Sequence, residues 1–327
     1  MSGPSSRFVV AFLLALALAR PGAPPRALGA PALLERPAGP PAALRTVIVL
    51  DRATLDGWGI GRPSGVAYDA DGSLYVLDAT RRRVVKLGGD GAFLHEVELA
   101  GADAARLVQP TDLAIDARGS VLVLDRAAGS VLAYDKRGAL LASHDFDPSI
   151  ADDARAAGAS ILLDSFSRLW LLAPRARDLV RLDDALAPAG AGRFLAPEDS
   201  VGLPAAAAIA PSGDAWIADA ASGLLRRFRA SGALATSTAL ADSGGPAPVV
   251  TALAVDRDGY VFAGDAANDR VSVVAPDGRR VLDRALGGPA SPWRPAAIAW
   301  SRLDRIAVAD PDRGEVQILA VERGPAP

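Results

Sequence analysis

One sequence pattern occurs six times along this chain: an apolar run, Asp or a substitute, a short polar turn, a second apolar run and usually another Asp. Aligned on the turn, the six equivalent residues, called anchor residues below, are Asp69, Asp116, Asp164, Ala210, Asp256 and Ser301. They follow one another at intervals of 47, 48, 46, 46 and 45 residues. A period of this length, built from strand-like runs, is typical of a β-propeller with one blade per copy. The pattern therefore predicts an all-β, six-bladed β-propeller of four-stranded antiparallel blades.

The first copy predicts the strands of one blade, at residues 65–69, 74–77, 83–87 and 93–99. Apolar residues make up 50% of the chain and aromatic residues only 5%, so the core must consist mainly of Ala, Val, Leu and Ile. Ala and Leu favour helices, but the alternation around each anchor residue has period two, and this pattern outweighs propensity.

The sixth copy ends after the run 315–321 and has no fourth strand. A β-branched run, residues 45–50 (RTVIVL), lies just before the first blade. If this run pairs beside residues 316–319, the ring closes and both unpaired edges disappear. We therefore predict that the N-terminal strand completes the last blade.

The ends of the chain predict an exported protein. Arg7 precedes the apolar run 8–19, which ends in an A-x-A sequence and is read as a signal peptide of residues 1–19. This run is shorter than the roughly 20 residues that cross a bilayer, and the alternatives are an uncleaved anchor or a wrongly assigned start of the chain. Residues 20–44 are rich in Pro and Ala and predict a flexible tether, followed by the propeller at 45–321 and a short tail at 322–327.

The amino-acid composition restricts where the protein can be located in the cell and which partners it can bind. The chain has no cysteine, so neither a disulfide nor a lipid on cysteine is available. We expect a periplasmic or secreted protein that contacts a membrane only through an uncleaved leader. The net charge of −3 argues against a nucleic-acid partner, which requires a broad basic surface.

The fifth copy carries the sequence Asp265-Ala-Ala-Asn268-Asp-Arg270-Val271. It resembles the D-x-x-N-x-R-[IV] pattern of the NHL-repeat propellers, and the resemblance extends with less regular copies over most of residues 45–321. The first copy keeps Asp78 and Arg83 but has Arg81 in the place of Asn, and the other copies lose both Asn and Arg. NHL-like propellers are mostly binding platforms, so the resemblance implies a binding protein rather than a reaction.

The residues that begin the inner strands should line the mouth of the central channel. Four and five residues before the anchors, these positions are Gly65, Asp112, Ser160, Ala206, Ala252 and Ala297, and Ser64, Thr111, Ala159, Ala205, Thr251 and Ala296. Six-bladed lactonases of the gluconolactonase type hold a divalent cation at this depth, but a cation such as Ca²⁺ needs about six to eight oxygen ligands. Only Asp112 offers a carboxylate here, so we expect no metal and no cofactor.

Two further sets of residues have structural explanations. Five aspartates end the second strands, at Asp78, Asp125, Asp219, Asp265 and Asp310. Because one group repeated in five blades suits loop capping better than an asymmetric ligand, we expect these aspartates to bind backbone amides. The only histidines, His95 and His144, fall in outer strands and have no nucleophile or metal motif nearby. We therefore assign no catalytic residue.

The loops on the channel-mouth face are the candidate binding surface, because recognition concentrates on loops held by a rigid scaffold. The candidate residues, which include Asp112 at the channel mouth, are Trp58, Arg81, Arg82, Asp112, Arg126, Arg175, Arg177, Trp293, Arg294 and Arg313. Trp and Arg are common at energetic hot spots, and such a surface suits a protein partner or an anionic glycan. The alternative is that the arginines pair with acidic residues on the same side, namely Asp147, Asp152, Asp153, Glu198 and Asp199.

These observations leave three hypotheses open. The first is a non-catalytic exported module that binds a protein or a glycan. The second is a divergent propeller hydrolase or lactonase that uses Asp112 and the mouth loops. The third is a structural subunit of an envelope complex.

Overall fold

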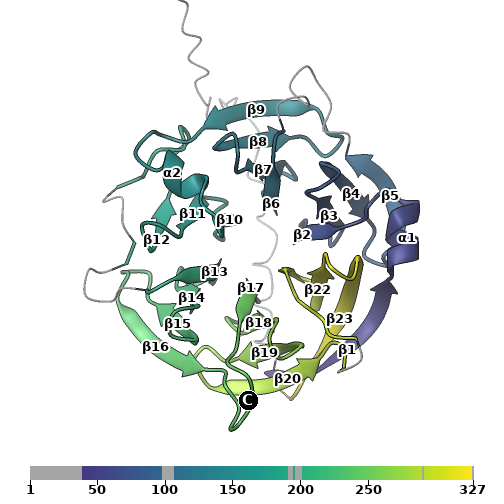
Figure 1. The fold of residues 1–327 in the computed structure, drawn as a ribbon, viewed down its shortest axis with the longest axis vertical. Coiled ribbons are helices and arrows are strands. Elements are labelled where there is room, and N and C mark those ends of the chain that lie inside the picture. Colours follow the sequence, from purple (N-terminus) through teal and green to yellow (C-terminus); the bar gives the residue numbers. More distant parts are fainter. Residues whose placement is uncertain (1–38, 98–106, 191–193, 196–200, 289–290, 326–327) are drawn as a thin grey trace, which may run out of the picture. The chain divides into compact units, whose positions relative to one another are not determined.

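A computed structural model describes residues 39–97, 107–190, 194–195, 201–288 and 291–325 of the chain. These residues form six antiparallel β-sheets arranged as blades around a central channel (Figure 1). The predicted six-bladed all-β propeller is confirmed. The expected signal peptide and residues 20–38 of the expected tether lie outside the described residues. In the described part of the chain, no helix has the length and apolar character needed to cross a membrane.

Each blade is a meander that starts at the channel and runs outward. In blade order, the inner strands are β2 (Pro63–Tyr68), β6 (Pro110–Ile115), β10 (Ser160–Leu163), β13 (Pro204–Ile209), β17 (Val250–Val255) and β21 (Ala297–Ser301). The second strands are β3 (Leu74–Asp78), β7 (Val121–Asp125), β11 (Leu169–Ala173), β14 (Ala215–Asp219), β18 (Val261–Asp265) and β22 (Arg305–Asp310). The third strands are β4 (Arg83–Leu87), β8 (Ser130–Tyr134), β12 (Asp178–Arg181), β15 (Leu224–Phe228), β19 (Arg270–Val274) and β23 (Glu315–Arg323).

The outer strands are β5 (Phe93–Val97), β9 (Leu140–Asp145), β16 (Leu234–Ala239), β20 (Arg280–Ala285) and, in blade six, β1 (Pro41–Leu50). Blade three differs from the others, since its described sheet has three strands, β10, β11 and β12. Two short helices also occur, α1 (Arg52–Gly57) and α2 (Ala151–Ala154). Helix α1 follows from local capping: the side chain of Asp51 accepts a hydrogen bond from the Thr54 amide at 2.9 Å. Helix α2 has no side-chain cap.

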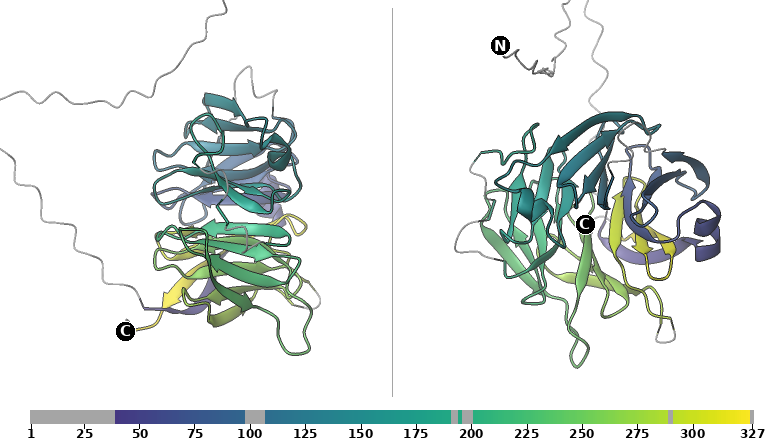
Figure 2. Two further views of the ribbon diagram at one scale, coloured as in Figure 1. Left: turned by 90° about the vertical axis from the view of Figure 1, so that its left-hand side faces the viewer. Right: turned by 45° about the horizontal axis from the view of Figure 1, so that its top comes forward.

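The last blade is closed by the first strand, as predicted. β1 pairs antiparallel with β23 from Pro41 opposite Arg323 to Leu50 opposite Val316. In Figure 2, β1 in purple and β23 in yellow lie side by side. β1 begins at Pro41, so residues 41–44, which the sequence assigns to the tether, belong to the strand. Pairing of the two ends removes the unpaired edge that β23 would otherwise present.

The core consists of apolar layers between neighbouring blades. One such layer joins Tyr75 and Leu77 of blade one to Leu113 and Leu132 of blade two, all at most 4% exposed. Because neighbouring blades cover both faces of each second strand, strands such as β3, β14 and β18 are buried at every residue. Small residues therefore suffice for packing, which explains a core rich in Ala and Val.

Buried aspartates fix the loops on the channel-mouth face. Asp78 accepts hydrogen bonds from the amides of Gly61 and Arg62 before the inner strand, and from those of Thr80 and Arg81 after the second strand. Equivalent bonds are made by the other four second-strand aspartates, Asp125, Asp219, Asp265 and Asp310. All five are at most 2% exposed. The predicted capping role is confirmed, and it makes the loop scaffold around the channel mouth rigid.

Candidate functional site

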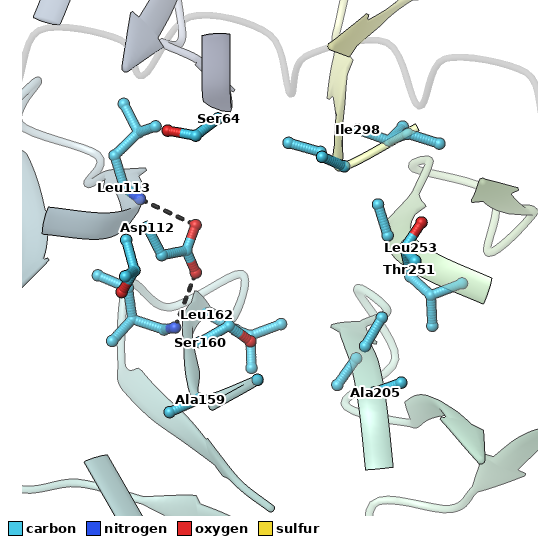
Figure 3. Close-up of a pocket in the computed structure, with 18 of the residues that line it drawn as sticks. Ser64, Asp112, Leu113, Ala159, Ser160, Leu162, Ala205, Thr251, Leu253 and Ile298 are labelled. Carbon is cyan, nitrogen blue, oxygen red and sulfur yellow. Dashed lines mark hydrogen bonds between the residues drawn. The ribbon is translucent and has the colours of Figure 1, made fainter. Parts of the chain in front are cut away.

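A cavity of about 270 Å³ opens at the end of the channel where the inner strands begin. Every residue predicted to surround this mouth lines the cavity except Gly65 (Figure 3). Most of the lining residues are small: Gly158, Ala159, Ala205, Ala206, Ala207, Ala252, Ala296, Ala297, Ser64, Ser160, Thr111 and Thr251. Small side chains in six neighbouring strands leave the space open, so the cavity follows directly from the repeat positions.

Asp112 is the only residue with an ionisable side chain among the described residues that line this cavity. One carboxylate oxygen accepts a hydrogen bond from the Leu113 amide at 2.9 Å, and the other accepts one from the Ile161 amide at 3.0 Å. The second bond joins blade two to the inner strand of blade three (Figure 3). The side chain is thus held in one position at the cavity wall.

The surroundings of Asp112 favour its protonated form. Burial raises the pKa of its carboxyl group from 3.8 to about 7, against the smaller opposing effect of the two amide donors. Near neutral pH, this carboxyl group is therefore present in both protonated and ionised forms. A side chain with these properties in a cavity can donate a proton and take it back.

Thr111 places a hydroxyl group next to Asp112 in sequence, on the same cavity wall. Its Oγ1 is buried and has no hydrogen-bond partner in the part of the chain that the structure describes. Two other hydroxyl groups of the wall are engaged: Ser64 Oγ donates to the Leu77 carbonyl oxygen at 3.2 Å, and Thr251 Oγ1 donates to the Pro295 carbonyl oxygen. A buried hydroxyl group without a partner is costly, so Thr111 Oγ1 is placed to bond a ligand or water.

The donor set of the cavity does not suit a divalent cation of the kind held by six-bladed lactonases. Such cations need several oxygen ligands, most of them charged. Among the described residues, no group of three or more His, Asp or Glu side chains is placed to hold a metal ion. Both oxygens of Asp112 already accept amide hydrogens. We therefore derive no step through a metal at this site.

The two histidines lie away from the cavity. His95 is in β5 and His144 is in β9, both outer strands with exposed side chains at these positions. The ring of His95 lies 3.1 Å from the carbonyl oxygen of Lys136 in blade two. Neither histidine lines the cavity.

Most of the predicted arginines lie on the loop face in ion pairs. The distances below join a guanidinium nitrogen to a carboxylate oxygen. They are 3.3 Å for Arg81 and Asp56, 3.9 Å for Arg175 and Asp152, and 2.8 Å for Arg313 and Glu315. Arg294 lies 3.9 Å from Asp312. Three predicted arginines remain. Arg82 and Arg177 are exposed, and Arg126 is half-buried.

The acidic partners are largely different from those expected. Among the three of these residues that the structure describes, only Asp152 pairs with an arginine as proposed. The carboxylates of Asp147 and Asp153 accept backbone hydrogen bonds, from Ser149 and Ala176 respectively. Glu198 and Asp199 lie outside the described residues. Such local pairings depend on loop conformation, which the repeat pattern does not determine.

The expectation that Trp293 is an exposed contact residue is wrong. Its side chain is 1% exposed and packs with Ile298 and Val308 in the core between blades five and six. The guanidinium group of Arg313 lies 5.5 Å from its ring centroid. Trp58 is half-buried and its ring centroid lies 5.7 Å from that of Phe93. Large rings gain more from burial than from exposure, so these entry loops fold their tryptophans inward.

Part of the rim of the channel mouth is apolar, which was not predicted from the sequence. Val108, Leu203 and Val249, in the loops that enter three inner strands, are 53%, 51% and 49% exposed. Their backbone amides donate to the buried aspartates of their own blades. In blades one and six the rim carries Arg62 and Arg294, which both approach Asp312. These rim positions could have been located in the sequence, because each of these residues lies 16 or 17 positions before a second-strand aspartate.

Comparison with known proteins identifies the fold and no family. No protein-family model matches the chain, and no curated protein matches it in sequence. A gluconolactonase from Xanthomonas campestris is similar in structure, with a TM-score of 0.56 and 18% identity over 88% of this chain and 99% of that chain. Virginiamycin B lyase from Staphylococcus aureus has a TM-score of 0.54 and 14% identity over 84% of this chain and 99% of that chain.

A catalytically inactive His-to-Ala variant of that lyase, solved with quinupristin, has a TM-score of 0.51 and 14% identity over 80% of this chain and 95% of that chain. At these identities the likeness shows the fold alone. The chain is a six-bladed β-propeller whose structural neighbours include a gluconolactonase and a virginiamycin B lyase.

Proposed function

We propose that this protein acts on a small, uncharged polar molecule in the channel-mouth cavity, as a divergent propeller hydrolase or lyase in which Asp112 transfers the proton. The observation that carries the proposal is the Asp112 carboxyl group, fixed at the wall of a 270 Å³ cavity with its pKa raised to about 7 by burial. A catalytic acid or base works best when its pKa lies near the working pH.

The residues of this chain suggest a division of roles. In hydrolysis of an ester or lactone, protonated Asp112 donates to the carbonyl or leaving-group oxygen while water adds to the carbonyl carbon. Ionised Asp112 then takes a proton from the added water as the C–O bond to the leaving alcohol breaks. The Thr111 hydroxyl, buried and unpartnered among the described residues, supplies a hydrogen bond that orients the substrate. The Ala-rich remainder of the wall binds by shape and excludes charged groups. Proton transfer of this kind contributes typically about 10²- to 10⁴-fold to a rate.

The structural neighbours support an enzyme, since a gluconolactonase and a virginiamycin B lyase share this fold. The chemistry proposed here differs from theirs in its residues. Replacement of a histidine inactivates the lyase variant, whereas both histidines of this chain lie in outer strands. The proposal therefore depends on Asp112 and does not transfer a neighbour's catalytic group.

The test is turnover of a panel of neutral lactones and esters by the purified protein and by three variants. Asp112→Asn should lower kcat by about 10²-fold or more, and Thr111→Val should raise KM with a smaller effect on kcat. Asp116→Asn, at the turn beyond the other end of β6, is the matched control and should leave turnover unchanged. Turnover that survives Asp112→Asn, or none on any substrate, would contradict the assignment.

A second candidate function is the non-catalytic exported module for a protein partner or an anionic glycan. The observation that favours it is the rim of the mouth, where exposed Leu203 and Val249 on two blades accompany Arg62 and Arg294 on two others. A mixed apolar and cationic rim held by buried aspartates suits such a ligand.

Capture of a partner from envelope extracts, by the protein and by its Leu203→Asp and Arg294→Glu variants, tests this second function. Capture that both variants lose, together with no turnover, would favour the binding module. Capture that both variants retain would argue for attachment through another face, as expected for a structural subunit of an envelope complex.

A further inference from the structure

A cavity of about 160 Å³ lies between blades four and five, at the face opposite the channel mouth. Its wall comes from the turns that follow the inner strands β13 and β17, together with residues of β14 and β15 and of the outer turn of blade five. A cavity of about 150 Å³ is large enough to hold benzene. This one therefore has room for a small organic molecule.

In four of the other five blades, an aspartate organises the corresponding corner. Each anchor aspartate accepts hydrogen bonds from the amides two and four residues after it. The second oxygen is left for side-chain donors: Lys86 Nζ lies 3.0 Å from that of Asp69 in blade one. Trp170 Nε1 donates to that of Asp164 in blade three at 3.1 Å. The anchor carboxylate is thus the common acceptor of this corner.

Blade four has the donors of this corner but no carboxylate at the anchor position. Trp216 stands six positions after the anchor, as Trp170 does in blade three. Arg227 stands 17 positions after it, as Lys86 does in blade one. The anchor position itself holds Ala210, and Ala210, Trp216 and Arg227 all line the cavity. The cavity therefore lies where the other blades carry a carboxylate.

Arg227 uses only part of its hydrogen-bonding capacity within the described residues. Its Nε donates to Asp214 Oδ2 at 3.0 Å, its Nη2 donates to the same oxygen, and its Nη1 donates to the Pro276 carbonyl oxygen. A guanidinium group has five N–H donors, so two remain for a further acceptor. Arg257 and Asp258 also lie on the wall, 3.8 Å apart, and their charges offset each other.

We propose that this cavity binds a small monocarboxylate, whose carboxylate group takes the place of the missing anchor carboxylate. The Arg227 guanidinium group and the Trp216 indole group donate to it, as Lys86 and Trp170 donate to the anchors of their own blades. The organic part packs against Pro211 and Pro276, and the volume suits about two to four carbon atoms. A second carboxylate on the ligand is disfavoured, because Asp258 lies on the wall.

The experiment is a calorimetric titration of the full-length protein with propionate, at constant ionic strength set with chloride. The dissociation constant should be about 1 to 10 mM, as expected for a ligand of so few atoms. Propionamide has the same shape without the charge. It should bind at least about tenfold more weakly, because hydrogen bonds to a charged group are the stronger ones.

Three variants locate the site. Ala210→Asp restores the anchor carboxylate, so it should abolish propionate binding while the Tm stays at or above that of the wild type. Arg227→Gln should weaken propionate binding by about tenfold or more. Arg229→Gln is the matched control and should leave binding unchanged, because Arg229 is an exposed arginine of the same blade that does not line the cavity.

Propionate binding that survives in Ala210→Asp, or propionamide that binds as tightly as propionate, would overturn the proposal. An equal loss of binding in Arg227→Gln and Arg229→Gln would overturn it too, because it would show general attraction of an anion to a basic surface. The same holds if no binding is seen at ten times the expected dissociation constant. If Ala210→Asp does not fold, the comparison of the two arginine variants decides. Turnover at Asp112 tests the proposed function separately.

Discussion

The pH dependence of stability measures the state of the Asp112 carboxyl group directly. Burial raises its pKa from 3.8 to about 7 in the folded protein. Between these pH values the folded protein holds the proton and the unfolded chain has released it. The contribution of Asp112 to stability is therefore fully present below pH 3.8 and is lost as the pH rises through about 7.

The expected magnitude follows from the size of the pKa change. At about 1.36 kcal/mol per pKa unit, a rise from 3.8 to about 7 corresponds to about 4 kcal/mol. The cavity is open to water on one side, and screening reduces such energies. We therefore expect that Asp112 lowers the free energy of unfolding by about 2 to 4 kcal/mol between pH 4 and pH 8.

Urea unfolding of the wild type and of Asp112→Asn across this pH range isolates the effect. Asn retains an oxygen that accepts one of the amide hydrogen bonds, but it does not titrate. The wild-type stability relative to the variant should fall by about 2 to 4 kcal/mol from pH 4 to pH 8, because subtraction cancels the other groups. A difference that is flat over this range would refute the raised pKa and the acid–base role with it.

Asp219→Asn is a control with the opposite sign. Although burial opposes its ionisation, hydrogen bonds from Leu203, Ser222 and neighbouring amides hold the pKa of Asp219 below its usual value. Its stabilising effect is present above the unfolded pKa and is lost only as the pH falls through the folded pKa. The wild-type stability relative to this variant should therefore be flat between pH 5 and pH 8.

Three further predictions concern the scaffold and the site. Deleting residues 41–50 removes the buried side chains of Leu44 and Leu50 and exposes the edge of β23. The loss of stability, about 1.5 to 3 kcal/mol per leucine, should lower the Tm, and the exposed edge should cause self-association that light scattering detects. Trp293→Ala should cost about 3 to 5 kcal/mol in urea unfolding, and an effect confined to partner binding would contradict its burial. Dialysis against a chelator should leave turnover and Tm unchanged, and a stoichiometric cation lost in Asp112→Asn would overturn the donor-set argument.

The fold could be predicted from the sequence because one physical requirement recurs in every copy. Strands this short bury both faces only against neighbouring blades, so a period of 45 to 48 residues with alternating apolar runs has few solutions. The closing strand followed from the same reasoning, since β23 would otherwise have an open edge. The channel lining was also predictable, because equivalent positions of a repeat occupy equivalent places around the axis.

Features that depend on loop conformation could not be predicted in this way. Trp293 was expected on the surface because its loop position was known, but the direction of its side chain was not. The partners of the arginines differ for the same reason: Arg81 reaches Asp56 of α1, a helix that exists through one local cap. The exposed Leu203 and Val249 were missed because apolar residues were assumed to be core.

The contrast between repeated and single features gives the strongest argument about the site. The second-strand aspartates recur in five blades, and each fixes a loop, as expected of a structural element. Asp112 occurs once: the equivalent positions hold only Gly, Ser or Ala. Thr251 also occurs on the wall and joins two blades, but it does so with a neutral hydroxyl. Joining blades therefore does not require a carboxyl group, and a single carboxyl group whose pKa is raised by burial supports the proposed use of its proton.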